Sequence, residues 1–337
     1  MGVLPFLAAL LSACSSSGPK GSPTIKISGS STVFPVIARA VGAYRQTERG
    51  KGVKIELSEV GTSAGLRQFC AGEIAIANAS RPINSQELKA CSGNDITFIE
   101  LPLAFDALTV VVNRNNTWTD TITTKELSRT WDRQAQGRIN TWRQVNLDWA
   151  DRPLSLCAPG SDSGSFDYFN QAINGDQTNA RSDVKSSEDD NVLVSCVANN
   201  PNAMGYFGFA YYKANTDRLK ALAIAHEGGQ PVLPSLENVQ KGRYTPLSRP
   251  LFVYVNDKQM RRNDEIRRLV GFTLGNGLRF VAEAGSIPLP PDTYRIVEAK
   301  LYRHILGTSF GGNLPVGLSF SDSLRRSFDE TRKPEFR

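Results

Sequence analysis

The sequence contains few of the residues that metal centres and histidine-dependent catalysis require. Two histidines and five cysteines occur among 337 residues, and no two cysteines have the C-x-x-C spacing. Zinc sites are usually built from such closely spaced pairs, so we expect neither a metal nor another cofactor. His226 lies in an Ala/Gly-rich stretch and His304 in a basic segment near the C-terminus. Neither context indicates a general base.

Long blocks of one charge sign are absent as well. The 39 basic and 33 acidic residues are interspersed, and they leave a net charge of +6. Chains that bind nucleic acid usually concentrate basic residues in a patch or stripe, so we expect no nucleic-acid partner. Hydrophobic residues make up 40% of the chain, which is enough for a large buried core.

The N-terminal apolar run, residues 3–11, is too short to span a bilayer as a helix. A short apolar segment that ends in small residues is typical of an export signal. Its ending, Leu-Ser-Ala-Cys at 11–14, resembles the lipobox of bacterial lipoproteins. The resemblance implies a signal peptide over residues 1–13 and a lipid on Cys14 as the only attachment to a membrane; an ordinary secretory signal is the alternative. Residues 14–23 are rich in Ser, Gly and Pro, which favours a flexible tether.

Strand-like and helix-like segments alternate from residue 24 onward. The apolar pattern predicts strands at 24–28, 54–60 and 73–78, a helix over 33–44 and a short helix over 66–71. Asn84, Ser85, Gln86 and Glu87 provide the residues of a capping box, which predicts the start of another helix. Such alternation predicts an α/β fold with parallel strands.

Two apolar strands divide the chain into lobes. Residues 107–113 and 251–256 are continuous apolar runs, as expected for strands buried on both faces, and a further α/β series lies between them. We therefore predict a discontinuous first lobe over 24–105 and 251–308 and a second lobe over 106–250. The chain would cross between the lobes twice. Residues 309–337 are predicted to form a loose C-terminal tail.

The cysteines other than Cys14 are even in number: Cys70, Cys91, Cys157 and Cys196. An even number in an exported chain predicts disulfides, and four cysteines allow three pairings. We favour Cys70–Cys91 and Cys157–Cys196, because each bridge would close a loop within one predicted lobe. Free thiols are the alternative.

Four segments share one design, in which a strand ends, a loop of small and hydroxyl-bearing residues follows, and a helix usually begins. They are residues 29–35, 61–65, 79–82 and 162–166. The N-terminus of a helix leaves backbone N–H groups without partners and carries about half a positive charge. Small residues let an anion approach those groups, and Ser and Thr hydroxyls add donors. The four segments therefore predict one shared oxyanion site.

These loops and two further segments resemble the phosphate-binding component of bacterial high-affinity phosphate ABC transporters, in its cyanobacterial form. The resemblance rests on GSSTVFP at 29–35, ASRPI at 79–83, DSGSFDYF at 162–169, EDDN at 188–191 and MGYFGFAYY at 204–212. It implies a two-lobed α/β periplasmic-binding-protein (type II) fold with two hinge crossovers, which closes on one phosphate in the interlobe cleft. It also implies a periplasmic monomer that delivers phosphate to the permease subunits of an ABC transporter.

Carried over motif by motif, the resemblance assigns phosphate contacts to all four loops. The candidates are Ser31, Thr32, Val33, Thr62, Ser80, Arg81, Ser163, Gly164 and Ser165. Two family positions differ: an aspartate near Ser80 is missing, and Pro159 stands where many members have an arginine. We expect Arg81 to supply the missing positive charge, because its planar fork suits an oxyanion.

Selectivity depends on a proton acceptor. Phosphate carries a proton at neutral pH and sulfate does not, so a carboxylate that accepts this proton would favour phosphate. Asp162 and Asp167 are the candidates that lie nearest the loops in sequence. The alternative is that Asp162 caps a helix and Asp167 is solvated.

Other functions compete with this hypothesis. A binder for sulfate or molybdate could share the architecture, and a phosphate sensor or scavenger would share the binding chemistry. A serine hydrolase or phosphatase would use Ser163 as a nucleophile, but it would need a base or a metal cluster that the sequence does not indicate. We therefore expect no enzyme activity.

Overall fold

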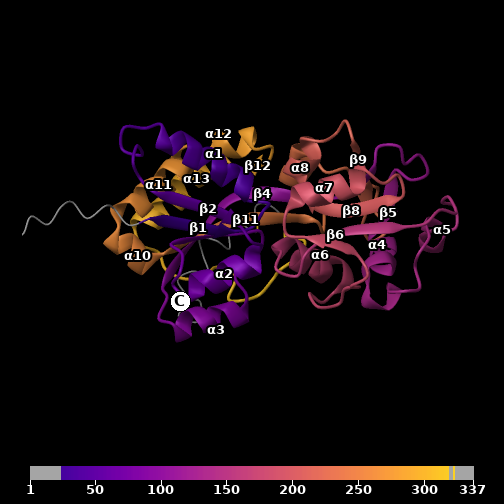
Figure 1. Ribbon diagram of the computed structural model, residues 1–337, viewed down its shortest axis with the longest axis horizontal. Helices are drawn as coiled ribbons and strands as arrows, with labels where there is room; N and C mark the ends of the chain where they lie inside the picture. The colour runs from indigo at the N-terminus through magenta and orange to yellow at the C-terminus, as the bar shows by residue number, and fades with distance from the viewer. Residues whose placement is uncertain (1–23, 319–321, 323–337) are drawn as a thin grey trace, which may run out of the picture.

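Parallel strands and the helices between them build the first lobe, on the left of Figure 1. The computed structural model describes residues 24–318 and 322. In this lobe β1 lies between β2 and β3, and the three strands run parallel. The elements of the first lobe are β1 (Ile25–Gly29), α1 (Phe34–Arg45), β2 (Ile55–Glu59), α2 (Thr62–Cys70), β3 (Ile76–Ala79), α3 (Ser85–Gly93), α10 (Asp257–Arg262), α11 (Asp264–Gly275), α12 (Gly277–Glu283), β12 (Ile287–Pro288) and α13 (Pro291–Tyr302).

The second lobe, on the right of Figure 1, repeats the design with β6 between β7 and β8, all parallel. Its elements are β5 (Thr121–Thr123), α4 (Thr124–Trp131), the 3-10 helix η1 (Arg133–Ala135), α5 (Trp142–Val145), β6 (Ser155–Pro159), α6 (Gly164–Asn174), β7 (Lys185–Ser187), α7 (Asp190–Ala198), β8 (Ala203–Gly208), α8 (Phe209–Lys213), β9 (Leu219–Ala221), β10 (Ala223–Ala225) and α9 (Leu236–Gln240).

Two strands join the lobes: β4 (Phe98–Asn113) and β11 (Ser248–Asn256). The first part of β4 pairs antiparallel with β11, and its last part pairs with β8 and β9. β11 also pairs with β3. One sheet, in the order β2-β1-β3-β11-β4-β8-β6-β7, therefore runs through both lobes. The predicted α/β fold with two crossings agrees with this topology, whereas the residue boundaries of the lobes stay a prediction.

Local sequence sets the helix starts. Asn84 and Glu87 form the predicted capping box of α3, in which each side chain accepts the other residue's backbone N–H at 2.9 Å. Helix α2 begins at Thr62, earlier than predicted, because Gly61 at φ 87° turns the chain directly from the end of β2 into the helix. Within residues 24–318 and 322, no helix has the length and apolar character needed to cross a membrane.

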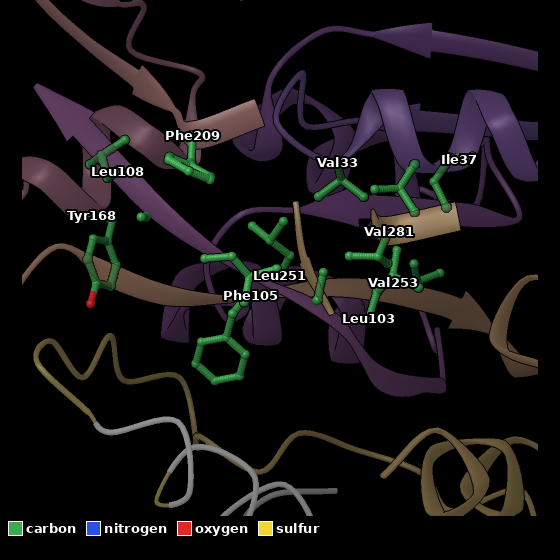
Figure 2. Close-up of a cluster of buried hydrophobic side chains, with 14 of the residues drawn as sticks. Val33, Ile37, Leu103, Phe105, Leu108, Tyr168, Phe209, Leu251, Val253 and Val281 are labelled. Atoms are coloured by element: carbon green, nitrogen blue, oxygen red, sulfur yellow. The ribbon is translucent and has the colours of Figure 1, made fainter. Parts of the chain in front are cut away.

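One apolar cluster continues from the first lobe through the crossing strands into the second. Figure 2 shows Val33 at the N-cap of α1, Ile37 on α1, Phe105 and Leu108 on β4, and Tyr168 on α6. These side chains are all at most 4% exposed. The crossing strands are thus buried on both faces, as their continuous apolar sequences predict.

Both favoured disulfides are present, so the predicted pairing is confirmed. Cys70–Cys91 joins α2 to α3, and Cys157–Cys196 joins β6 to α7. Each bridge lies within one lobe, and therefore neither restricts movement of one lobe relative to the other.

The prediction of a loose tail is wrong for residues 309–318. Ser309 donates its backbone N–H to Glu100 at 2.9 Å, and the ring of Phe310 lies 5.5 Å from that of Phe252. Phe310 is 2% exposed, so burial of one aromatic ring docks this segment on the first lobe. The predicted signal peptide and tether, with Cys14, and the tail beyond residue 318 apart from Asp322 lie outside the described residues.

We predict that Phe310→Ala lowers the free energy of unfolding by about 3 kcal/mol, because it removes a buried ring and leaves a cavity. Urea denaturation followed by circular dichroism measures the loss. Leu147→Ala is the control, since Leu147 is 81% exposed and its removal should cost less than about 0.5 kcal/mol. Equal effects of the two variants would mean that Phe310 does not dock as described.

Candidate functional site

Three helices begin at the boundary between the lobes. α1 and α2 follow β1 and β2 of the first lobe, and α6 follows β6 of the second. The carboxyl ends of parallel strands lie at the same edge of a sheet, so the helix N-termini that follow them gather there. Each N-terminus carries backbone N–H groups and a partial positive charge at the boundary between the lobes, which we call the crevice.

Hydroxyl groups from the two lobes meet in the crevice. Thr32 Oγ1, which precedes α1, lies 3.3 Å from Ser165 Oγ in the first turn of α6. Thr62 Oγ1 lies 3.2 Å from Ser80 Oγ and accepts the backbone N–H of Ser80 at 3.1 Å. All four residues are at most 1% exposed. The structure thus brings all four predicted loops together.

Gly164 makes the closest approach between the lobes. A Cβ atom placed on Gly164 would lie 2.6 Å from Thr62 Oγ1 and 2.7 Å from Ser80 Oγ. Such distances are too short for a real side chain. The first residue of α6 must therefore be glycine if the lobes are to close to this degree.

Arg249 and Asp106 complete the site, and the sequence analysis missed both. They are direct partners in the register of β11 and β4, and they are at most 1% exposed. Arg249 donates from Nη2 to Asp106 Oδ2 at 3.0 Å, to Ser165 Oγ at 2.7 Å and, more weakly, to Thr32 Oγ1 at 3.4 Å. Its Nη1 donates to the Gly164 carbonyl at 3.2 Å. One guanidinium thus contacts loops of both lobes.

Asp106 is held from two sides. Its Oδ2 accepts from Arg249, and its Oδ1 accepts the backbone N–H of Phe209 at 2.9 Å. An arginine two residues before the apolar run 251–256 was the signal that could have pointed to this pair, because a charge next to a strand buried on both faces needs a buried partner. The partner itself is visible only when β4 and β11 are paired.

Residues 15–275 match a family model described as a PBP superfamily domain. This chain belongs to the PBP superfamily. It is 41% identical to Protein SphX of Synechocystis sp. over 96% of either chain, and 34% identical to Phosphate-binding protein PstS of Staphylococcus aureus over 79% of either chain. A possible phosphate binding protein from Planctomyces limnophilus has a crystal structure that is 36% identical, with a TM-score of 0.62; the match covers 84% of this chain and 98% of that one. The predicted family and fold class are confirmed.

In this PBP superfamily member Arg81 does not have the role that the resemblance led us to expect. Its guanidinium donates to Glu87 twice at 2.8 Å, to Asp167 at 2.6 Å, to Ser63 Oγ at 2.8 Å and to the Pro82 carbonyl at 3.0 Å. These contacts use all five N–H donors of an arginine. Arg81 therefore has no donor left for an anion, and the assignment of its side chain to the anion site is wrong.

Arg81 instead joins the lobes. Glu87 belongs to α3 of the first lobe, whereas Asp167 belongs to α6 of the second. Burial raises the pKa of Asp167, although the neighbouring Arg81 opposes the shift. Arg81 and Asp167 line a groove of about 390 Å³. The groove has α2 and α3 on one side and the start of α6 on the other. A second interlobe pair, Arg67 with Asp162 at 2.7 Å, lies in the same groove.

The remaining candidates lie around the hydroxyl groups. Ser163 caps α6 by accepting the N–H of Ser165 at 3.1 Å, and Val33 is the N-cap of α1. The Ser31 carbonyl accepts a hydrogen bond from Tyr211 Oη at 3.0 Å. Asp162 is 38% exposed and paired with Arg67, so it is a poor acceptor for a buried proton.

Residues 61–65 have the G-x-S-x-G spacing of a nucleophile elbow, which the sequence analysis overlooked. The central Ser63 accepts from Arg81 at 2.8 Å and donates to Asp167 at 3.3 Å, and no histidine contacts it among the described residues. His226 lies beside Thr124, and His304 pairs with Asp257. The carboxylate that Ser63 contacts, Asp167, is bound to Arg81 at 2.6 Å through the same oxygen. The geometry therefore does not support an activated nucleophile.

We predict that Arg81→Leu lowers the free energy of unfolding by about 3 kcal/mol, because Glu87 and Asp167 would stay buried without their cationic partner. Arg67→Leu is the control: Arg67 is 61% exposed, and its pair should contribute at most about 1 kcal/mol. Chemical denaturation compares them. A loss for Arg81→Leu as small as that for Arg67→Leu would contradict the account of Arg81 as a buried interlobe partner.

Proposed function

We propose that this protein binds inorganic phosphate in the crevice, outside the cytoplasmic membrane, and delivers it to an ABC-type phosphate permease. The observation that carries the proposal is the convergence of Arg249, four hydroxyl groups and three helix N-termini from both lobes on one buried place. Each of these groups donates to an anion. The printed names of the relatives, phosphate-binding protein among them, support the choice of phosphate.

The phosphate contacts are assigned by chemistry and place. Arg249 supplies the charged donor in place of Arg81. The hydroxyls of Thr32, Thr62, Ser80 and Ser165 and the backbone around Ser31, Val33, Ser163 and Gly164 supply the others. Hydrogen bonds to charged groups contribute about 1.5–3 kcal/mol each, and ordering of the lobes offsets part of that sum.

Asp106 is the acceptor for the proton of phosphate. It is fully buried, and its partner Arg249 also contacts the hydroxyl of Ser165. Asp162 is half-exposed, and Asp167 lies with Arg81 in the groove beside α2 and α3. A buried carboxylate at the ligand repels a fully deprotonated oxyanion and binds a protonated one by a hydrogen bond. Phosphate is therefore favoured over sulfate at neutral pH.

Transport rather than catalysis is the role of this site. The protein acts as a monomer held to the membrane through a lipid on Cys14, after cleavage of the signal peptide, and it contacts phosphate and the permease subunits only. Cys70–Cys91 and Cys157–Cys196 suit such an oxidising compartment.

Titration calorimetry of the purified protein with phosphate, arsenate and sulfate tests the proposal. We expect tight binding of phosphate, weaker binding of sulfate and no release of phosphate from a phosphoester. Phosphate uptake in a strain that lacks the gene separates delivery from sensing or scavenging. Absence of phosphate binding would overturn the proposal.

Gly164→Ala should weaken phosphate binding at least about tenfold. Its Cβ atom would push against Thr62 and Ser80 and hold the lobes apart. Gly42→Ala is the matched control, because a Cβ atom on Gly42 of α1 meets nothing within 4 Å. Calorimetry gives both affinities. Similar affinities of the two variants would show that close contact between the lobes at Gly164 is not needed for binding.

Asp106→Asn should lower the ratio of phosphate to sulfate affinity at least about tenfold at pH 7, since an amide can donate to sulfate where the carboxylate repels it. Asp162→Asn is the control and should leave the ratio unchanged. Competition binding at constant ionic strength measures the ratio. An effect of Asp162→Asn alone would move the acceptor role to Asp162.

A further inference from the structure

Three carboxylates at the lobe boundary each have an oxygen that makes no hydrogen bond among the described residues. Glu59 Oε2 belongs to the first lobe, and Glu188 Oε2 and Asp190 Oδ2 belong to the second. We call these three residues the crevice carboxylates. Buried polar atoms are normally satisfied, so three unsatisfied carboxylate oxygens in one region call for a physical explanation.

Contacts across the lobe boundary hold this arrangement. A Cβ atom placed on Gly61, the N-cap of α2, would lie 2.7 Å from Glu188 Oε2, so Glu188 touches the first lobe. The other oxygen of Glu188 accepts the backbone N–H of Asp162 at 3.0 Å. Asp190, the first residue of α7, is 1% exposed. Closure of the lobes therefore helps to bury Glu188, and it brings Asp190 within electrostatic reach of Glu59 in the first lobe.

Most of the charged groups around the crevice carboxylates are negative, as the carboxylates themselves are. Glu188 is influenced by the anions Asp162 and Asp167 and by the cation Arg67. Asp190 faces the anions Asp106, Glu59 and Asp189 and the cation Arg249, and Tyr211 of α8 lies in the same field. Arg67 and Arg249 are already paired, with Asp162 and Asp106. The cations nearby thus do not neutralise the crevice carboxylates.

Burial is the largest cause of raised pKa values in these groups. It raises the pKa of Glu188 to about 7 and that of Asp190 to about 8. It also raises the pKa of Glu59, with a contribution from Asp189. No cluster of His, Cys, Asp and Glu in the described part of the chain is arranged to hold a metal ion. Protonation of a carboxylate removes its negative charge and so relieves the repulsion between these groups.

We propose that closure of the lobes takes up protons on the crevice carboxylates, so that a rise in pH favours the open form and promotes release of the bound anion. The inference rests on the proposed function, because phosphate binding is the event that closes the lobes. Glu188 and Asp190 are not among the assigned phosphate contacts. The inference gives them a separate role, in which their protonation shifts the balance between retention and release of the bound phosphate.

The direction follows from linkage. A carboxyl group whose pKa is higher in the closed form binds more protons there than in the open, hydrated form. Its contribution to closure is complete below the ordinary carboxyl pKa of about 4–4.5. The contribution declines as the pH rises, and it is lost once the pH passes the closed-form values of about 7 and 8.

Calorimetry of phosphate binding in buffers of different ionisation enthalpy counts the protons taken up on binding. At pH 6.5 we expect the wild type to take up about one proton or more in excess of the double variant Glu188→Gln/Asp190→Asn. At pH 9 the excess should disappear. Between these pH values, the phosphate affinity of the wild type should fall at least about tenfold more than that of the double variant. Phosphate itself also titrates in this pH range. Its contribution is the same for both proteins, so it is removed when the proton uptake of the variant is subtracted from that of the wild type.

The double variant Glu56→Gln/Asp148→Asn is the matched control, because both residues are exposed; it should behave like the wild type. The single variants Glu188→Gln and Asp190→Asn are measured too, and each should show part of the effect even if the double variant does not fold. Phosphate binding with equal proton uptake in wild type and variants would overturn the inference while leaving the proposed function intact. No phosphate binding by the wild type would overturn both.

Discussion

The buried pair of Arg249 and Asp106 is the interaction on which the organisation of the crevice depends. The two residues face each other on β11 and β4, the strands that join the lobes. A buried ion pair persists only if both charges keep hydrogen-bond partners after they lose water. Here the partners come from the backbone of Phe209, from Thr32 and from the start of α6. The strands that join the lobes and the proposed anion site therefore share the same side chains, which links the position of the lobes to the groups between them.

Charged residues on the two sides of the crevice have opposite effects on the contact between the lobes. In the groove beside α2 and α3, Arg81 binds Asp167 of the opposite lobe and Arg67 binds Asp162, so the contacts there attract. At the start of α7, carboxylates of the two lobes approach one another with unsatisfied oxygens. Closure thus gains from some contacts and is opposed by others. Opposing contacts of this kind allow a ligand or protons to shift the balance between an open and a closed form.

Several features could be predicted from residues close in sequence. The strand–loop–helix segments at Thr32, Thr62 and Ser163, the capping box at Asn84 and Glu87, and the two disulfides all appear as expected. The wrong assignment of Arg81 has a local cause too. Glu87 was recognised as a capping residue, but its carboxylate also accepts from Arg81. The sequence pattern of a cap does not reveal that second contact.

The sequence by itself determined where strands end and helices begin, because hydrophobic period, capping residues and glycines act over a few neighbouring positions. It therefore also determined which loops offer N–H groups and hydroxyls to an anion. Only the tertiary structure decided which arginine lies at the crevice, because Arg249 and Asp106 are 143 residues apart and meet through the pairing of two strands. The same holds for the docking of Phe310 and for the meeting of Glu59 with Asp190. Contacts between distant segments depend on how the sheet is assembled, and no local pattern encodes that assembly.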